Sequence, residues 1–230
     1  MDLPNEVPVM TLPNAILFPH AVLPLYIFEP RYRRMLADSL ATHRMFSVAM
    51  QRSGRARETP SAVAGLGLIR AARQNEDGTS LLLLQGIARV ELGGAVRYKP
   101  YRIHRIRPLP CASANNVVVD ALLLKVRELV MERLQQAGPI QPQLLQHLAQ
   151  LNHADKTKPQ IAGSIEDALD QLILLNPPDQ LADLVSRTLL PSSVQRQTIL
   201  ETVGVEDRLK HLIHFLMAEI RRNRKDGAHE

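Results

Sequence analysis

Short apolar runs separated by turn residues fill the first half of the chain, and this pattern predicts β-strands. The runs are bounded by prolines, glycines or polar residues and cover residues 7–10, 22–28, 46–50, 62–73, 80–84 and 86–92, and a basic strand is expected at 97–107. One segment differs, because Tyr32, Met35 and Leu36 recur at helical spacing. It begins at Pro30, and proline fits the first turn of a helix. Many strands with one early helix predict a small barrel or a strongly curved sheet.

Glycines indicate where this sheet turns and where another backbone segment comes close to it. Gly65 and Gly67 lie inside one apolar run, where they predict a bulge or a close approach of another backbone segment. The tetrapeptide at 75–78, Asn-Glu-Asp-Gly, predicts a hairpin turn because its glycine accepts a positive φ. Gly93 and Gly94 are expected to interrupt the sheet before the basic run at 97–107.

The second half has the 3.6-residue period of helices. Helices are expected at 118–136, 142–151, 179–189 and 193–202, with a final helix that begins near Val205. Ser164 and Asp167 have the spacing of a helix N-terminal capping pair. A proline-rich and polar stretch at 108–116 separates the two patterns. We therefore expect a β-rich domain at 1–112 and an α-helical bundle at 113–230.

Composition narrows the class of protein. The chain has 230 residues, of which 45% are hydrophobic and 22% charged, as in ordinary globular proteins. Its single cysteine, Cys111, excludes an internal disulfide framework. The longest apolar run falls far short of the ~20 residues of a membrane helix, and the acidic N-terminus does not resemble a signal peptide. These features predict a cytoplasmic protein that does not contact membranes.

Positive charge is concentrated in the first half. Residues 1–112 contain 15 Lys+Arg and 8 Asp+Glu, a balance of +7, whereas the whole chain carries +5. If 97–107 were one strand, alternate residues would share a face, including Arg97, Tyr101, Arg105 and Arg107. Tyrosine beside arginine can stack on RNA bases while the arginines hold phosphates. The alternative is an edge strand whose charges prevent aggregation.

Motifs for catalysis are missing from the sequence. There is no phosphate-binding G-x-x-x-x-G-K-[ST] loop, no G-x-S-x-G and no H-E-x-x-H. His211 and His214 are three residues apart on a predicted helix, but two imidazoles without further ligands are not a metal site. Cys111 has no neighbouring base to activate it. We expect a protein without enzymatic activity, cofactor or metal.

One long segment resembles a known family. Residues 11–32, TLPNAILFPHAVLPLYIFEPRY, resemble the opening of the substrate-binding domain of ATP-dependent Lon proteases. The similarity continues at 77–79, 84–90, 98–101, 178–184 and 200–209, so it covers most of the chain. His20 departs from the pattern, since the family commonly has glycine there, and we expect a less sharp turn or an exposed ring.

The resemblance implies an α+β fold: a PUA-like β pseudo-barrel with one early helix, followed by a helical bundle. It also implies binding of unfolded or exposed polypeptide segments. Delivery of these segments to a separate protease is a further expectation. Proteolysis itself does not transfer, because the sequence has neither an ATPase loop nor a Ser-Lys protease motif. RNA binding through the arginine-rich barrel is the alternative.

The corner at 28–33 and the strand before it form the candidate binding site, because a strand there gives way to a helix at the domain surface. Tyr26, Phe28 and Tyr32 are candidate apolar anchors, and Glu29 and Arg31 are candidates for orienting a bound chain. Alternatively, Phe28 and Tyr32 pack the barrel against the following helix. A cleft at the domain junction is a second candidate site.

Overall fold

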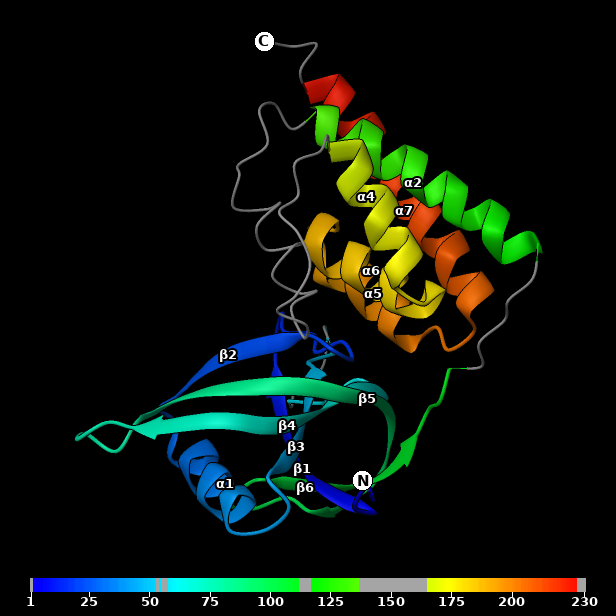
Figure 1. Cartoon of the computed structure of the whole chain (residues 1–230). Helices are drawn as coiled ribbons and strands as arrows, with labels where there is room; N and C mark the ends of the chain where they lie inside the picture. The colour runs from blue at the N-terminus through cyan, green and yellow to red at the C-terminus, as the bar shows by residue number, and fades with distance from the viewer. Residues whose placement is uncertain (1, 53, 55–57, 112–116, 137–164, 227–230) are drawn as a thin grey trace. The chain divides into compact units, whose positions relative to one another are not determined.

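The structure, a computed structural model, describes residues 2–52, 54, 58–111, 117–136 and 165–226 (Figure 1). Two compact units divide the chain. The first joins Met1–Ala112 to Pro191–Val203, and the second joins Ser113–Leu190 to Gly204–Glu230. Strands dominate the first unit and helices the second, which confirms the predicted α+β class.

A six-stranded sheet forms the first unit. Its strands are β1 (Glu6–Leu12), β2 (Val22–Ile27), β3 (Met45–Met50), β4 (Val63–Gln74), β5 (Ser80–Arg97) and β6 (Arg102–Pro108). The order is β2-β5-β4-β3-β1-β6, and β6 also pairs with β5. This second pairing closes five strands into a barrel and leaves β2 outside the ring, as an extra strand on β5.

The long strand β5 makes this arrangement possible. Its first half pairs with β2, from Ser80 opposite Ile27 to Gln85 opposite Val22. Its second half pairs with β6 instead, and β4 pairs with both halves. The sequence predicted separate strands here with a break at the glycines, which is wrong. Glycines 86, 93 and 94 instead lie within one strand, where the register shifts of a bulged ladder absorb the curvature.

The prediction of one strand over the basic run at 97–107 is wrong. β5 ends at Arg97, residues 98–101 form the connection, and β6 begins at Arg102. Arg97 consequently lies opposite Ile103 on the neighbouring strand. Pro100 explains the difference, because proline cannot donate to a sheet ladder and marks a turn.

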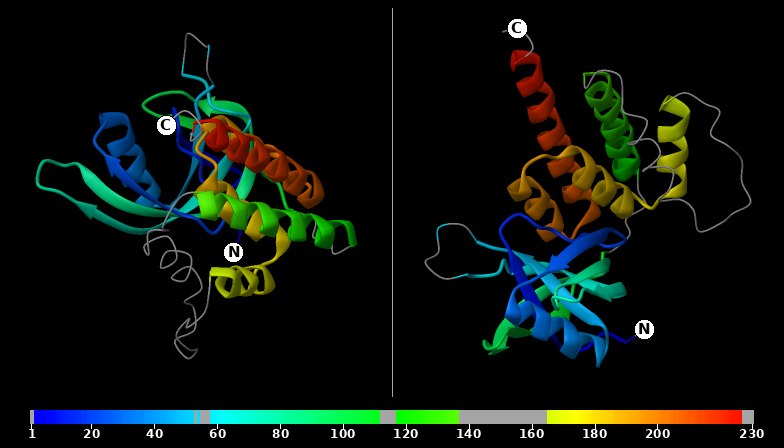
Figure 2. Two further views of the ribbon diagram at one scale, coloured as in Figure 1. Left: turned by 90° about the horizontal axis from the view of Figure 1, so that it is seen from above. Right: turned by 90° about the vertical axis from the view of Figure 1, so that its left-hand side faces the viewer.

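Helix α1 (Pro30–Leu40) packs against β1 and β3 (Figure 2). Pro30 occupies its first turn, as predicted. Tyr32, Met35 and Leu36 project into a core that also contains Phe46 and Leu84. The helical spacing therefore places these three side chains on the face of α1 that packs into the barrel core. The hairpin turn at 75–78 is also confirmed, with Gly78 at a φ of 77°.

Helix α6 (Ser193–Glu201) belongs to the first unit although it lies far along the chain. The side-chain amide of Gln197 donates to the Val63 carbonyl at 2.9 Å. Arg89, buried on β5, donates to the Leu200 carbonyl at 3.2 Å. The sequence placed 191–203 with the helical domain, because a helical period does not show which unit a helix joins.

The second unit contains α2 (Val117–Gln136), α4 (Ile165–Leu175), α5 (Pro178–Leu189) and α7 (Val205–Asp226). Helices α2 and α7 run side by side (Figure 2), and α5 also packs on α7. Within this unit Arg208 on α7 pairs with Asp183 on α5 at 3.3 Å, and both side chains are buried. The predicted helix at 142–151 and the predicted cap at Ser164 lie outside the described residues.

Candidate functional site

Strand β2 is apolar on both of its faces. Leu23, Leu25 and Ile27 pack against the barrel core. The alternate residues Val22 and Tyr26 point away from it, with 48% and 53% of their surfaces exposed. A strand with one solvated face ordinarily carries polar residues on that face. The outward side chains of β2 therefore do not serve the core of the fold.

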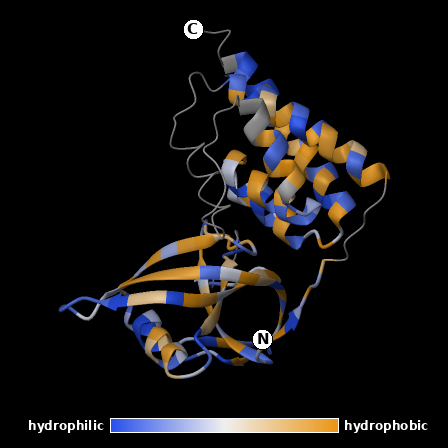
Figure 3. Ribbon diagram, in the orientation of Figure 1, coloured by the Kyte–Doolittle hydropathy of each residue, from blue (hydrophilic) through white to orange (hydrophobic). Residues whose placement is uncertain are grey.

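The neighbouring strand continues this apolar surface. On β5, Leu81 lies opposite Tyr26 and Leu83 lies opposite Pro24, and these leucines are 52% and 44% exposed. Directly paired residues in a sheet share a face. We call this surface the outer apolar strip: Val22, Pro24, Tyr26, Phe28, Leu81 and Leu83. In Figure 3 both strands are coloured largely as hydrophobic.

Two aromatic rings form one end of the outer apolar strip. The rings of Tyr26 and Phe28 stack with their centroids 5.9 Å apart and their planes 28° apart. Phe28 is the more exposed of the two, at 59%. Adjacent flat rings offer a large apolar contact area with little conformational freedom to lose. Two of the five predicted site residues are thus brought together on the surface.

Arginines border the strip on the side of β4. Arg73 lies opposite Leu81, so Tyr26, Leu81 and Arg73 form one row across three strands. Arg70, at an irregular position of β4, donates to the side-chain oxygen of Gln85. The strip is therefore flanked by positive charge on one side and, among the described strands, by the unpaired edge of β2 on the other.

The two polar side chains predicted to orient a bound chain form ion pairs within the fold. Arg31 pairs with Glu29 at 2.8 Å and with Glu58 at 2.7 Å. Its guanidinium also lies 4.4 Å from the centre of the Tyr32 ring. Glu29, Arg31 and Glu58 thus form a charged cluster at the start of α1, and both predicted orienting side chains are engaged in it.

Tyr32 is a core residue. It is 4% exposed, and its hydroxyl lies 3.2 Å from both the backbone nitrogen and the backbone oxygen of Thr11. Burial, followed by the nearby charge of Glu58, raises the pKa of Tyr32 to about 12, so its hydroxyl stays protonated. Of the two expectations for this residue, packing of α1 against the barrel describes its place, whereas Phe28 is exposed.

Tyr101, the aromatic residue among the predicted RNA contacts, is also buried. Tyr101 is 4% exposed, and its hydroxyl donates to the Asp38 carboxylate at 2.7 Å. This hydrogen bond lowers the pKa of Asp38. The guanidinium of Arg97 lies 4.7 Å from the Tyr101 ring centre. The ring is therefore covered on the face that an RNA base would need.

The other predicted RNA-contact residues lie in ion pairs. Arg105 is 3.7 Å from Glu6, and Arg107 is 2.6 Å from Glu91. All four side chains remain largely exposed, so these pairs hold the arginines only weakly. Neighbouring carboxylates nevertheless reduce the positive potential that a phosphate backbone would encounter.

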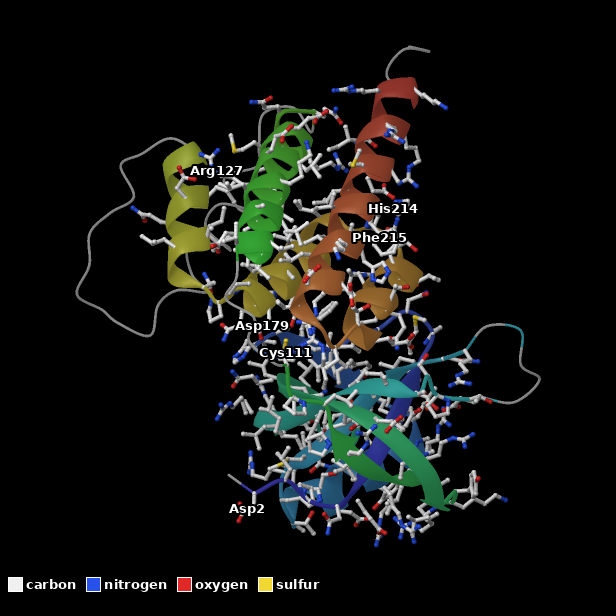
Figure 4. The ribbon with its side chains drawn as sticks, turned by 90° about the vertical axis from the view of Figure 1, so that its right-hand side faces the viewer. Asp2, Cys111, Arg127, Asp179, His214 and Phe215 are labelled. Carbon is white, nitrogen blue, oxygen red and sulfur yellow. The ribbon has the colours of Figure 1, made fainter. Side chains whose placement is uncertain are left out.

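The two histidines and the cysteine that were considered for metal binding or catalysis make contacts within the fold. His211 and His214 both pack against the ring of Phe215 on α7. His214 and Phe215 are labelled in Figure 4. Cys111 donates its thiol to the Val203 carbonyl at 3.2 Å. Within the described parts of the chain, no three His, Cys, Asp or Glu side chains form a group suited to a metal ion. None of the described helices combines the length and apolarity needed to cross a bilayer.

Sequence reasoning missed Val22, Leu81 and Leu83 as members of the site. A signal for them was present, because residues 22–28 and 81–84 are apolar without alternation. Such runs are ordinarily read as strands buried on both faces. The pairing of β2 with β5, which turns alternate members of both runs outward, is a long-range contact that the runs do not specify.

The model of the ATP-dependent protease La (LON) substrate-binding domain matches residues 6–218, nearly the whole chain. The chain belongs to this family. The membership predicted from the motifs is confirmed, and the family is one of substrate recognition. His20, for which a less sharp turn or an exposed ring was expected, has a φ of 62°, in the left-handed region that favours glycine, and its side chain is exposed.

Curated relatives of the chain are Lon proteases. Lon protease 2 of Myxococcus xanthus is 26% identical over 223 residues, which is 94% of this chain and 24% of the relative. Lon protease of Paraburkholderia phytofirmans is 29% identical over 227 residues, or 95% of this chain and 25% of the relative. The chain thus spans about a quarter of the length of these relatives, and the match lies in the Lon substrate-binding domain.

Solved structures share the fold. The N-terminal domain of a Mycobacterium avium complex Lon protease has a TM-score of 0.64 at 19% identity, covering 92% of this chain and 98% of that one. A Lon N-terminal domain protein from Xanthomonas campestris has a TM-score of 0.58 at 19% identity, covering 91% and 98%. The barrel followed by a helical segment is therefore the fold of the Lon N-terminal domain.

Proposed function

We propose that the chain binds unfolded polypeptide segments through the outer apolar strip and does no chemistry on them. The observation that carries this proposal is the exposure of Tyr26, Phe28, Leu81 and Leu83 on one face of a sheet whose other face forms the core. Contiguous apolar side chains on a protein surface are typical of interaction sites. Membership of the substrate-binding family supports polypeptide as the ligand.

The captured segment would then pass to an ATP-dependent protease. This step rests on the relatives, which are named as Lon proteases and match this chain along about a quarter of their length. The strip itself offers no nucleophile: its members are apolar apart from the Tyr26 hydroxyl. Recognition and hydrolysis would therefore be functions of different modules.

Replacing strip residues by serine tests the proposal. We expect Tyr26→Ser and Leu81→Ser each to weaken binding of fluorescent, reduced and carboxymethylated lactalbumin by about tenfold. Burying half of such a side chain contributes about 1 kcal/mol or slightly more. Both residues are already more than half exposed, so the free energy of unfolding should change by less than about 0.5 kcal/mol.

Matched controls separate the strip from general hydrophobicity. Tyr98 is 65% exposed on the same barrel but lies outside the strip, so Tyr98→Ser is the control for Tyr26→Ser. Val96→Ser serves likewise for Val22→Ser, because both valines are 48% exposed on strands. Equal losses in strip and control variants would show that the strip is not the binding surface.

A further inference from the structure

The free edge of β2 is the feature that identifies how a polypeptide would be held. Among the described strands β2 pairs with β5 alone. The Gly86 amide donates to the Ala21 carbonyl at 2.8 Å, which fixes the hydrogen-bonding phase of this antiparallel pair. Residues alternate between bonded and non-bonded positions in such a pair. Counting on from Ala21, the backbone groups of Val22, Pro24 and Tyr26 point away from β5.

The position of Pro24 agrees with this phase. Proline has no amide, and within sheets it occupies edge strands with its nitrogen toward solvent. If Pro24 faced β5, the ladder between these strands would lose a bond at its centre. The outward edge therefore presents two amides, of Val22 and Tyr26, and the carbonyls of all three residues. This is the set of groups that an additional strand pairs with.

The side chains beside this edge show what the additional strand would contain. Toward the core, Leu23 and Leu25 are only partly buried, although they pack against the buried cluster. On the opposite face lie Val22 and Tyr26, both about half exposed. A strand placed at the edge would set its side chains alternately beside these two pairs. It would therefore meet apolar neighbours on both of its faces.

We propose that β2 receives a continuous apolar segment as an added β-strand. This proposal rests on the proposed function and specifies the substrate class: runs of aliphatic and aromatic residues that form fully buried strands in folded proteins. Strands of that kind read as unbroken hydrophobic runs. They become accessible only when a protein unfolds, so this mode of binding would itself distinguish unfolded from folded chains. Affinity would come from main-chain hydrogen bonds and breadth of specificity from apolar packing.

Amide hydrogen exchange of the full-length protein, observed by NMR, tests the proposal. The probe is a peptide with about six alternating valine and phenylalanine residues between serine and asparagine ends. We expect the Val22 and Tyr26 amides to exchange at least tenfold more slowly when the peptide is bound. The amides of Leu23 and Leu25 already bond to β5 and serve as internal references. Unchanged exchange at Val22 and Tyr26 with bound peptide would overturn strand addition.

Methylated peptides provide a second test that does not depend on register. One peptide carries N-methyl groups on every second residue of the apolar run and the other on every residue. The alternately methylated peptide keeps one edge whose amides can pair with β2 and should bind almost normally, whereas the fully methylated peptide keeps none and should lose about tenfold or more in affinity. Equal binding of both peptides would contradict the proposal.

Three further outcomes can be distinguished. If these peptides bind but neither test shows strand addition, polypeptide binding stands and its mode is wrong. If neither the peptides nor the unfolded lactalbumin binds, the proposed function itself fails. If the Val22 and Tyr26 amides are protected before peptide is added, and the protection rises with protein concentration, a second copy of the chain occupies the edge. That outcome would also overturn the proposal.

Discussion

At the scale of single residues, two glycines allow a loop segment to lie directly on the barrel. A Cβ atom on Gly65 would fall 1.9 Å from the Leu17 carbonyl oxygen, and one on Gly86 would fall 2.0 Å from that of Phe18. Leu17 and Phe18 are fully buried, so this segment supplies part of the core. It also leads directly into β2, and its position therefore helps to place the outer apolar strip.

We expect Gly86→Ala to lower the free energy of unfolding by about 3 kcal/mol, because the new methyl group would force two backbone segments apart. Gly94→Ala is the control: it lies on the same strand, and a Cβ there would have no atom within 4 Å. Its effect should stay within about 0.5 kcal/mol. Urea unfolding followed by circular dichroism measures both. Similar stability of the two variants would contradict the close approach.

Three tyrosines show which exposures could be predicted from the sequence and which could not. The sequence placed Tyr26, Tyr32 and Tyr101 among the candidate site residues, and the structure exposes only Tyr26. The helical spacing of Tyr32 with Met35 and Leu36 did indicate a buried face. Nothing in the local sequence indicated that Asp38, on α1, would accept the hydroxyl of Tyr101. That contact joins residues 63 positions apart and depends on the closure of the barrel.

At the scale of elements, the strands and the early helix follow from local pattern, whereas their partners do not. The apolar run at 22–28 and the turn at 75–78 predicted β2 and the β4–β5 hairpin. The alternation of the basic run at 97–107 predicted one strand, whereas the proline within it lies in the connection between β5 and β6. The placement of α6 on the barrel depends on contacts such as Gln197 to Val63, across 134 residues.

We propose that α6 is an integral part of the barrel domain, and Gln197→Ala tests this. Loss of its hydrogen bond leaves the Val63 carbonyl without that donor, so we expect unfolding to become easier by about 1 kcal/mol. Amides at the start of β4 should exchange faster. Thr198→Ala is the control, since the hydroxyl of Thr198 donates within its own helix, to the Val194 carbonyl at 3.1 Å. Unaltered exchange at β4 in Gln197→Ala would show that α6 adds nothing to the barrel.

At the scale of the whole molecule, charge and apolar surface favour different partners. The excess of positive charge lies in residues 1–112, which first suggested RNA. In the structure, Arg31, Arg105 and Arg107 lie beside carboxylates, and Tyr101 is buried. In the outer apolar strip, by contrast, Tyr26, Phe28 and Leu81 each expose more than half of their surface. These features favour a polypeptide held mainly by apolar contact.

Salt separates the two possibilities. Apolar contact is little screened, so we expect the dissociation constant for unfolded lactalbumin to change less than about threefold between 0.05 M and 0.3 M salt. RNA held through phosphates would lose affinity log-linearly, by orders of magnitude over the same range. Parallel titrations with the unfolded protein and a structured RNA measure both slopes. Arg107→Gln serves as the control variant, because it removes a barrel charge outside the strip and should leave polypeptide binding unchanged. A steep salt dependence of polypeptide binding, or RNA binding that exceeds it at 0.3 M salt, would show that the arginines rather than the strip form the principal binding surface.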